Sequence, residues 1–234
     1  MRPTAEGLKV PTAVNVGTQA HQFGPLPPLQ PASARTLAVE VGARAAILVE
    51  GWSDQAAVDT LARRWSLDLQ AEHIMTIPIG GITNLGAFVH ELGHSGLRLD
   101  LAGLCDAAEE NYTRRTLGRA GLGPVQSRID LESLGFFVCE VDLEDELIRA
   151  LGTPGVEAVL HEQGELTSFR RFQDQPAQRG RSVHAQLHRF LGTRAKRKIR
   201  YGSLLVEAID LSAVPRPLEL VIAHARTTRA SGEV

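Results

Sequence analysis

Short apolar runs alternate with stretches of helical spacing along the middle of the chain. Four segments have the length and composition of buried strands: AAILVE (45–50), HIMTIPIGG (73–81), LRLDLAGLCD (97–106) and the start of FFVCEVDLEDELIRALG (136–152). Helical spacing occupies 33–43, 54–65, 83–93, 107–121 and the end of the fourth segment. Ser33 and Gly42 mark the ends of the first helix, and Thr83 or Asn84 lies near the start of the third. This alternation predicts an α/β domain with a mainly parallel sheet and helices on both faces.

The flanking segments differ from this central region. Residues 1–31 are rich in proline and glycine, and a segment of that composition buries little apolar surface. We therefore expect an N-terminal Pro/Gly-rich segment at 1–31, one globular domain at 32–225 and a short tail at 226–234. The length of 234 residues and the apolar content of 43% suit one domain with a sizeable core.

Composition excludes several classes of protein. The net charge of −2 indicates no whole-chain attraction to nucleic acid or membrane. Cys105 and Cys139 lie in apolar runs, as reduced core cysteines of a cytoplasmic protein do. No apolar run approaches the roughly 18 residues of a membrane helix, and we expect no secretory signal. The sequence contains no G-x-x-x-x-G-K-[ST], so we expect no ATP binding through a P-loop.

Acidic residues follow three of the four expected strands. Glu50 and Asp54 follow the first, Asp106, Glu109 and Glu110 the third, and Glu140, Asp142 and Glu144 the fourth, whereas the second ends at Gly80 and Gly81. The carboxyl ends of parallel strands meet at one edge of a sheet, where such acids repel one another unless a cation lies between them. Oxygen ligands favour Mg²⁺ or Mn²⁺, and the chemistry best served is metal-assisted hydrolysis of a phosphodiester.

Several of these segments resemble TOPRIM domains. ILVEGWSD (47–54) is similar to the first TOPRIM motif, and PIGGITNLGAF (78–88) and LAGLCDAAEE (101–110) stand where the second and third strands belong. EVDLEDEL (140–147) and KIRYGSLLVEAI (198–209) resemble the C-terminal part of the overcoming-lysogenisation-defect (OLD) nuclease type, and the resemblance covers about residues 35–210. It implies a Rossmann-like TOPRIM fold with an OLD-type C-terminal extension, without the ABC-type ATPase of full-length relatives.

The resemblance also implies roles for individual residues. Glu50 would be a metal ligand or general acid/base, Asp54 a second acid of that site and Asp106 a metal ligand from the family's D-x-D motif. Lys198 would offset negative charge on the phosphate transition state. The later acidic stretch would help to build a second metal position; its members are Glu140, Asp142 and Glu144.

One position departs from the family pattern. Ala108 occupies the place of the second D-x-D aspartate, and Glu109 or Glu110 is an alternative source of that carboxylate. The resemblance therefore implies a Mg²⁺- or Mn²⁺-dependent DNA endonuclease, with a catalytically impaired nucleic-acid-binding or assembly module as the alternative. Expected partners are DNA, an ATPase on a separate polypeptide and further copies of the chain, but no membrane.

The segment 169–202 is dense in basic residues and contains Asp174 as its only acid. Such an excess favours contact with a phosphate backbone, and a solvated arginine-rich face is the alternative. The candidate nucleic-acid-binding residues are Arg194, Lys196, Arg197, Lys198 and Arg200. In the same segment, His184 and His188 share a helix face, either as metal ligands or as partly exposed helix residues without a third ligand.

HELGH, at His90 to His94, fits the zinc signature H-E-x-x-H, and Asp100 stands where some such enzymes place a third ligand. That site needs both histidines on one continuous helix. Gly93 and Gly96 weaken a helix, and a buried strand is expected just beyond. We therefore expect the helix to end between the histidines, which leaves a zinc hydrolase as a minor alternative.

Overall fold

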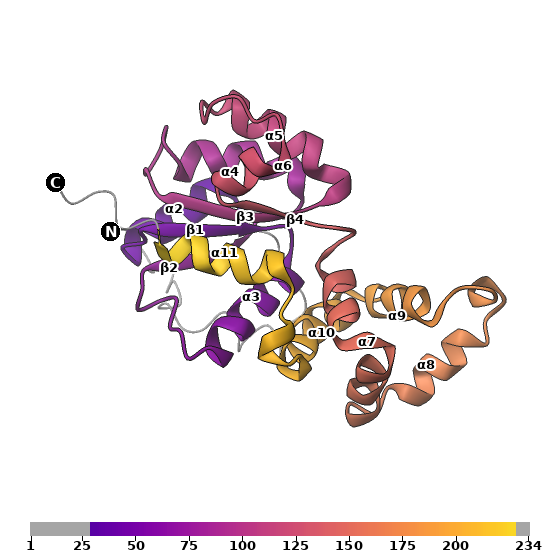
Figure 1. Cartoon of the computed structure of the whole chain (residues 1–234). Helices are drawn as coiled ribbons and strands as arrows, with labels where there is room; N and C mark the ends of the chain where they lie inside the picture. Colours follow the sequence, from indigo (N-terminus) through magenta and orange to yellow (C-terminus); the bar gives the residue numbers. More distant parts are fainter. Residues whose placement is uncertain (1–28, 228–234) are drawn as a thin grey trace, which may run out of the picture.

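The structure is a computed structural model that describes residues 29–227. The remaining parts of the expected N-terminal segment and tail, residues 1–28 and 228–234, lie outside the described residues. Four parallel strands form the central sheet: β1 Ala45–Val49, β2 Ile74–Pro78, β3 Asp100–Asp106 and β4 Phe136–Cys139. Their order is β2-β1-β3-β4 (Figure 1). The sequence-based expectation of a parallel α/β sheet is therefore confirmed.

Helices cover both faces of this sheet (Figure 1). One face carries α2 Pro31–Glu40, α4 Leu85–Leu92, α5 Glu110–Arg119 and α6 Arg128–Ser133, and the other carries α3 Trp52–Arg64 and α11 Arg216–Thr227. Successive side chains of β1 point to opposite faces, so Ala46 and Leu48 join one core while Ile47 and Val49 join the other. Burial on both faces explains why the strands are continuous apolar runs.

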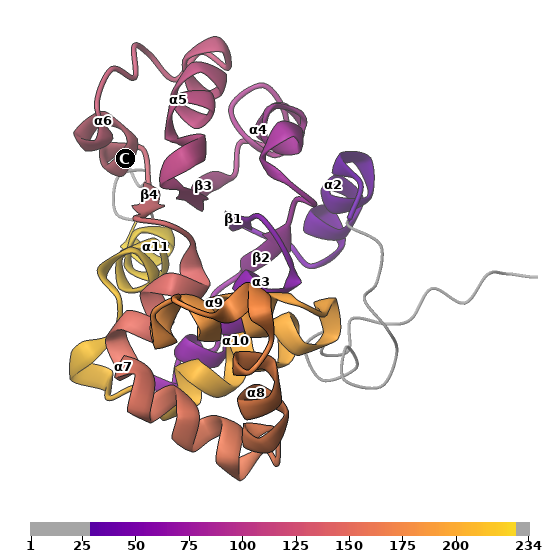
Figure 2. The same cartoon turned by 90° about the vertical axis from the view of Figure 1, so that its right-hand side faces the viewer.

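Four further helices lie beyond the carboxyl ends of the strands (Figure 1). They are α7 Leu143–Glu162, α8 Leu166–Gln173, α9 Val183–Gly192 and α10 Ala195–Ala208. They share a core with α3 and α11, and Figure 2 shows them on the same side of the sheet as those two helices. We call these four helices the helical layer. Short 3-10 helices are η1 Ile82–Asn84, η2 Ala107–Glu109, η3 Pro176–Gln178 and η4 Leu211–Ala213.

Helix α10 packs directly on the start of α3. A Cβ atom at Gly202 would lie 2.5 Å from the carbonyl oxygen of Ser53, so only glycine permits this close approach of two backbones. At the other end of α3, Arg64 adds a second link to α10, because its Nη1 donates a hydrogen bond of 2.7 Å to the carbonyl oxygen of Val206. The main chain thereby fixes α10 against the helix that follows β1.

Element ends differ from the sequence-based expectation at several places. The first helix begins at Pro31 with Gln30 as N-cap, not at Ser33, because proline is well suited to the first helical position. The strand expected at 73–81 ends at Pro78, since Gly80 and Gly81 both have positive φ. The strand expected from residue 97 begins at Asp100. Within residues 29–227, no helix is both long and apolar enough to span a bilayer.

Candidate metal centre

Three carboxylates meet at the edge of the sheet where β1 and β3 end. Oxygen atoms of Glu50, Asp106 and Glu109 all lie within 4.8 Å of one another. The first two converge because β1 and β3 are neighbouring parallel strands. Glu109 joins them because the 3-10 turn η2 follows Asp106 directly, while Ala108 in that turn is exposed. Of the two alternatives raised by the sequence, Glu109 is therefore the one that lies beside Asp106. We call these three residues the acidic triad.

The electrostatics of the acidic triad favour a cation. Burial, followed by the negative charge of Glu50 and then of Asp142, raises the pKa of Asp106 to about 8. Burial and the charge of Glu50 also raise the pKa of Glu109. The Glu109 Oε2 atom is buried and has no hydrogen-bond partner among the described residues. A buried acceptor of this kind is costly without a partner, and a divalent ion would provide one.

Asp54 lies next to the acidic triad at the start of α3. Its Oδ2 accepts a hydrogen bond of 2.8 Å from the backbone N–H of Gly51. Burial first, and the negative charge of Glu144 next, raise the pKa of Asp54 to about 7, against the opposing charge of Lys198. Lys198 Nζ lies 3.2 Å from Glu144 Oε1. Burial opposes the charge on Lys198, but the carboxylates of Glu144 and Asp54 outweigh it and raise the Lys198 pKa. The predicted lysine thus lies among the predicted acids.

Asp142 caps the N-terminus of α7 and is close enough for its charge to act on Asp106. Its Oδ1 accepts a hydrogen bond of 2.8 Å from the Asp145 N–H, and its Oδ2 lies 2.7 Å from His188 Nε2. Burial would raise the pKa of Asp142, but the contact with His188 lowers it. Its negative charge nevertheless acts on Asp106. His188 is therefore a neighbour of the site that the sequence indicated only through its spacing from His184.

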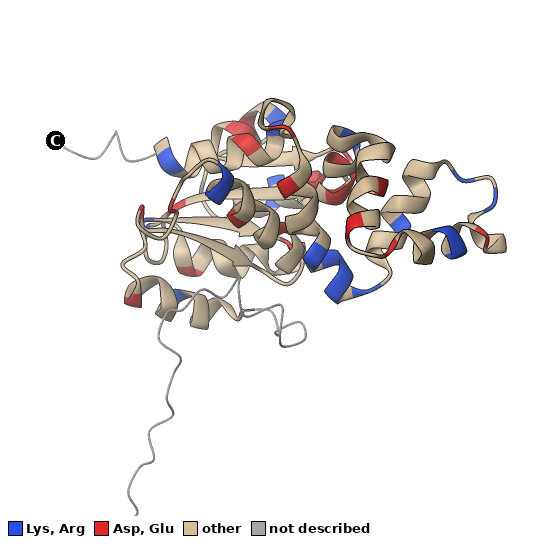
Figure 3. Ribbon diagram, turned by 90° about the horizontal axis from the view of Figure 1, so that it is seen from below, with Lys and Arg blue, Asp and Glu red and all other residues tan. Residues whose placement is uncertain are grey.

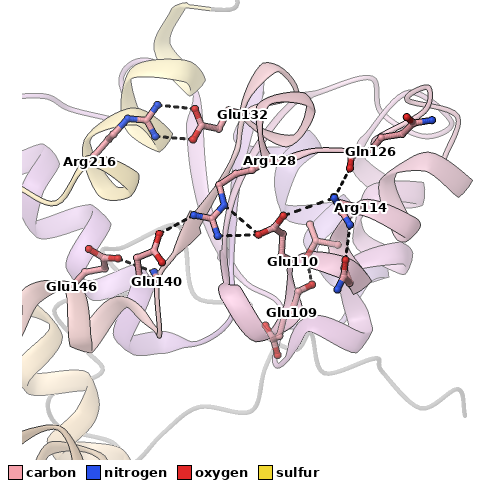
Figure 4. Close-up of polar contacts among 11 residues, drawn as sticks. Glu109, Glu110, Arg114, Gln126, Arg128, Glu132, Glu140, Glu146 and Arg216 are labelled. Carbon is pink, nitrogen blue, oxygen red and sulfur yellow. Dashed lines mark hydrogen bonds and ion pairs between the residues drawn. The ribbon is translucent and has the colours of Figure 1, made fainter. Parts of the chain in front are cut away.

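Glu140 is engaged elsewhere. Its Oε1 accepts a hydrogen bond of 2.8 Å from Arg128, and its side chain is 60% exposed. The same guanidinium lies 2.9 Å from Glu110 Oε2, so Arg128 bridges these two acids (Figure 4). Because Glu110 is held in this ion pair, it does not supply the carboxylate that Ala108 lacks. No motif in the sequence indicated Arg128.

Apart from Lys198, which pairs with Glu144, the predicted nucleic-acid-binding residues in and just before α10 fall into two groups. Arg197 lies 2.8 Å from Glu165 and its guanidinium stacks 4.1 Å from the centre of the Phe190 ring, and Arg200 contacts Glu165 at 3.3 Å. Their charges are offset within the helical layer. Arg194 and Lys196 are exposed and make no ion pair among residues 29–227. These two cations are therefore available to a partner.

HELGH does not form a single-helix zinc site. Helix α4 ends at Leu92, and Gly93 starts a tight turn in which a Cβ atom at Gly96 would lie 1.9 Å from the Glu91 carbonyl oxygen. His94 is consequently off the helix that carries His90, as the sequence predicted. Within the described part of the chain, the acidic triad is the only group of three side chains placed to hold a metal ion.

Comparison with known proteins agrees with this geometry. The family model described as "Overcoming lysogenization defect protein-like, TOPRIM domain" matches residues 43–107, which contain β1 to β3. The C-terminal region of the Xanthomonas campestris pv. campestris OLD protein is similar in structure, with 24% identity and a TM-score of 0.60 over 79% of this chain and 93% of that one. The C-terminal region of the Burkholderia pseudomallei OLD protein has 20% identity and a TM-score of 0.59 over 79% and 97%. A search of the curated proteins gave no match. The matched segment, the fold and the acids at the strand ends together show that this chain contains an OLD-like TOPRIM domain.

Proposed function

We propose that this chain is a divalent-metal-dependent DNA endonuclease that hydrolyses phosphodiester bonds with Mg²⁺ or Mn²⁺. The observation that carries the proposal is the acidic triad, in which oxygens of Glu50, Asp106 and Glu109 lie within 4.8 Å of one another at the end of two OLD-like TOPRIM strands. Carboxylate oxygens are the donors that these hard cations prefer. The unpartnered Glu109 Oε2 atom and the raised pKa of Asp106 also fit a cation at this place.

A bound ion would activate water and stabilise the charge that develops on the phosphate oxygens. The residues of the acidic triad would hold it, with Glu50 as a ligand or as the group that accepts the proton of the attacking water. Asp142, whose charge acts on Asp106, and the pair Asp54 and Glu144 would contribute to a second position.

Lys198 supplies the positive charge that phosphoryl chemistry needs near these acids. It is held by Glu144 at 3.2 Å, and its side chain is 42% exposed, so its ammonium is both positioned and reachable. A fixed cation beside a reacting phosphate stabilises the additional negative charge of the transition state. We propose that Lys198 acts on the substrate phosphate in this way.

A plasmid-nicking assay tests the proposed function. Purified protein is incubated with supercoiled plasmid in Mn²⁺, Mg²⁺ or EDTA, and conversion to nicked and linear forms is measured. We expect metal-dependent nicking that is lost in Glu50→Ala and in Asp106→Asn. The control is Glu40→Gln, which changes an exposed acid at the end of α2. Equal nicking by wild type and Asp106→Asn would contradict the proposal.

The alternative function is a TOPRIM module that binds nucleic acid without cutting it. The observation that favours it is Ala108, which stands where the family pattern has an acid and is exposed in the structure. Intact plasmid with every metal, combined with retained DNA binding, would support this module over the nuclease.

A further inference from the structure

A cavity of about 580 Å³ lies between the start of α7 and helix α9, outside the acidic triad. Its volume is within the roughly 300–1,000 Å³ of typical ligand sites. The charged and polar residues that line it are Asp145, Arg181, His184, His188, Arg189 and Thr193. The lining contains no aromatic side chain except the two histidines. Such a lining is suited to an anion more than to a stacked base or an apolar ligand.

Two arginines that line this cavity have no carboxylate partner among residues 29–227. Arg181 uses its Nε to donate a hydrogen bond of 3.1 Å to the Ala177 carbonyl oxygen. Arg189 makes no hydrogen bond or ion pair with another described side chain. In the helical layer, Arg149, Arg170, Arg197 and Arg200 have carboxylate partners, whereas Arg171 has none among residues 29–227. Arg181 and Arg189 are thus two free guanidinium groups that line the same cavity.

The only carboxylate in the lining is already neutralised. Asp145 Oδ1 lies 2.6 Å from His184 Nε2, and its Oδ2 lies 2.8 Å from Arg149 Nε. Both oxygens thus have a partner that is not Arg181 or Arg189. The cavity keeps a surplus of positive charge, which a phosphate or another anion would offset.

The cavity is linked toward the acidic triad through His188 and Asp142. His188 lines the cavity and contacts Asp142 at 2.7 Å, and the charge of Asp142 acts on Asp106. On its other side, Thr193 is followed directly by the exposed Arg194 and then by Lys196. Figure 3 shows basic residues in the loop between α8 and α9 and at the start of α10, with acidic residues at the junction with the sheet. Basic residues therefore lie at both ends of α9, with Arg181 before the helix and Arg194 and Lys196 after it.

We propose that the α9 cavity binds a backbone phosphate of the DNA strand that flanks the cleaved bond, through Arg181 and Arg189. For the identity of its ligand this inference rests on the proposed function. A free phosphate would satisfy the cavity alone, but the adjoining cations at Arg194 and Lys196 match a chain of phosphates that continues past it. The cavity would then set the position of the strand relative to the acidic triad without taking part in the chemistry.

The test is binding of fluorescein-labelled duplex DNA in EDTA over a range of salt concentrations. The variant is Arg181→Ala/Arg189→Ala, and the charge-matched control is Arg115→Ala/Arg119→Ala, which removes two exposed arginines from α5. Each phosphate contact contributes about 0.9 to the slope of log K against log salt. We expect the cavity variant to bind about 10-fold or more weakly and to lose about 0.9 from this slope, the contribution of one phosphate. We expect the control to change neither quantity appreciably.

Three further arms make the result specific. In plasmid nicking with Mn²⁺, the cavity variant should raise KM with little change in kcat, because the acidic triad is intact. Binding of inorganic phosphate is measured by isothermal titration of wild type and of the cavity variant. If only wild type binds phosphate while the two proteins bind DNA equally well, the proposal is overturned in favour of a small-anion site. A loss of affinity for duplex RNA but not for DNA would overturn it as well. Weakened DNA binding in a protein that never nicks plasmid would support the cavity and refute the nuclease.

Discussion

The raised pKa of Asp54 predicts that the metal-free protein loses stability as pH rises. Asp54 is buried, and burial and the charge of Glu144 raise its pKa from 3.8 to about 7. The folded protein therefore binds this proton more tightly than the unfolded chain does, so the stabilisation is largest at low pH and is lost as pH rises toward 7. The window for Asp54 is consequently between about pH 4 and pH 7.

The size of the effect follows from the same shift. Between about pH 5 and pH 7 the folded protein keeps the proton while the unfolded chain has lost it, and each pH unit changes the unfolding free energy by about 1.36 kcal/mol. Asp54 alone therefore accounts for about 2–3 kcal/mol over this interval. For a protein of this size, that corresponds to a fall of about 5–10 °C in Tm. Asp106, with a pKa of about 8, extends the fall to higher pH.

The assay is thermal unfolding followed by circular dichroism in EDTA, compared with Asp54→Asn. The asparagine side chain is neutral at every pH and can still accept the Gly51 N–H, so the variant should lack the Asp54 part of the fall. Asp174→Asn, at an exposed position after α8, is the control and should follow wild type. Mn²⁺ should restore the stability of wild type at high pH, because a cation favours the ionised acids. Parallel Tm profiles for wild type and Asp54→Asn would refute the electrostatic account of the site.

Three other substitutions test separate parts of the site. Glu109→Gln should weaken Mn²⁺ binding by about 10-fold or more, because it removes a carboxylate of the acidic triad. The affinity is measured by calorimetry, and the control Glu110→Gln should leave it unchanged. Equal effects of the two substitutions would mean that Glu109 is not a ligand. Lys198→Met should lower the unfolding free energy by about 1–3 kcal/mol because Glu144 loses its partner. Adding Glu144→Gln should restore stability but not nicking, and recovery of both would exclude a role for the lysine in the chemistry. Gly202→Ala should cost about 1–3 kcal/mol in urea unfolding, since its Cβ would lie 2.5 Å from the Ser53 carbonyl oxygen; an unchanged midpoint would contradict that contact.

The sheet was predictable because each strand is buried on both faces and its apolar run is therefore unbroken. Glu50, Asp54 and Asp106 were predictable for a related reason, since parallel strands must deliver the residues that follow them to one edge. Glu109 was not separable from Glu110 in the sequence. The choice depends on the turn η2 and on Arg128, which lies 18 residues beyond Glu110 along the chain and holds it in an ion pair.

Contacts between distant helices account for what the sequence did not indicate. The engagement of Glu140 by Arg128 and the pairing of Arg197 with Glu165 depend on how α6 and α8 pack, which no local pattern specifies. The contact between His188 and Asp142 joins residues 46 apart, and only their residue types were visible beforehand. A basic segment in the sequence therefore separates, once folded, into arginines that stabilise the helical layer and arginines that remain open to a ligand.

The backbone contact between Gly202 and Ser53 also determines which changes in the length of α10 would move Lys198 out of the site. Lys198 lies about one helical turn before Gly202, so the glycine fixes the rotation of α10 about its own axis and with it the direction of the ammonium group. One residue inserted between them would rotate Lys198 by about 100° away from Glu144, although every side chain of the site would still be present. We expect α10 to accept many exchanges of side chain between these two positions but no insertion or deletion.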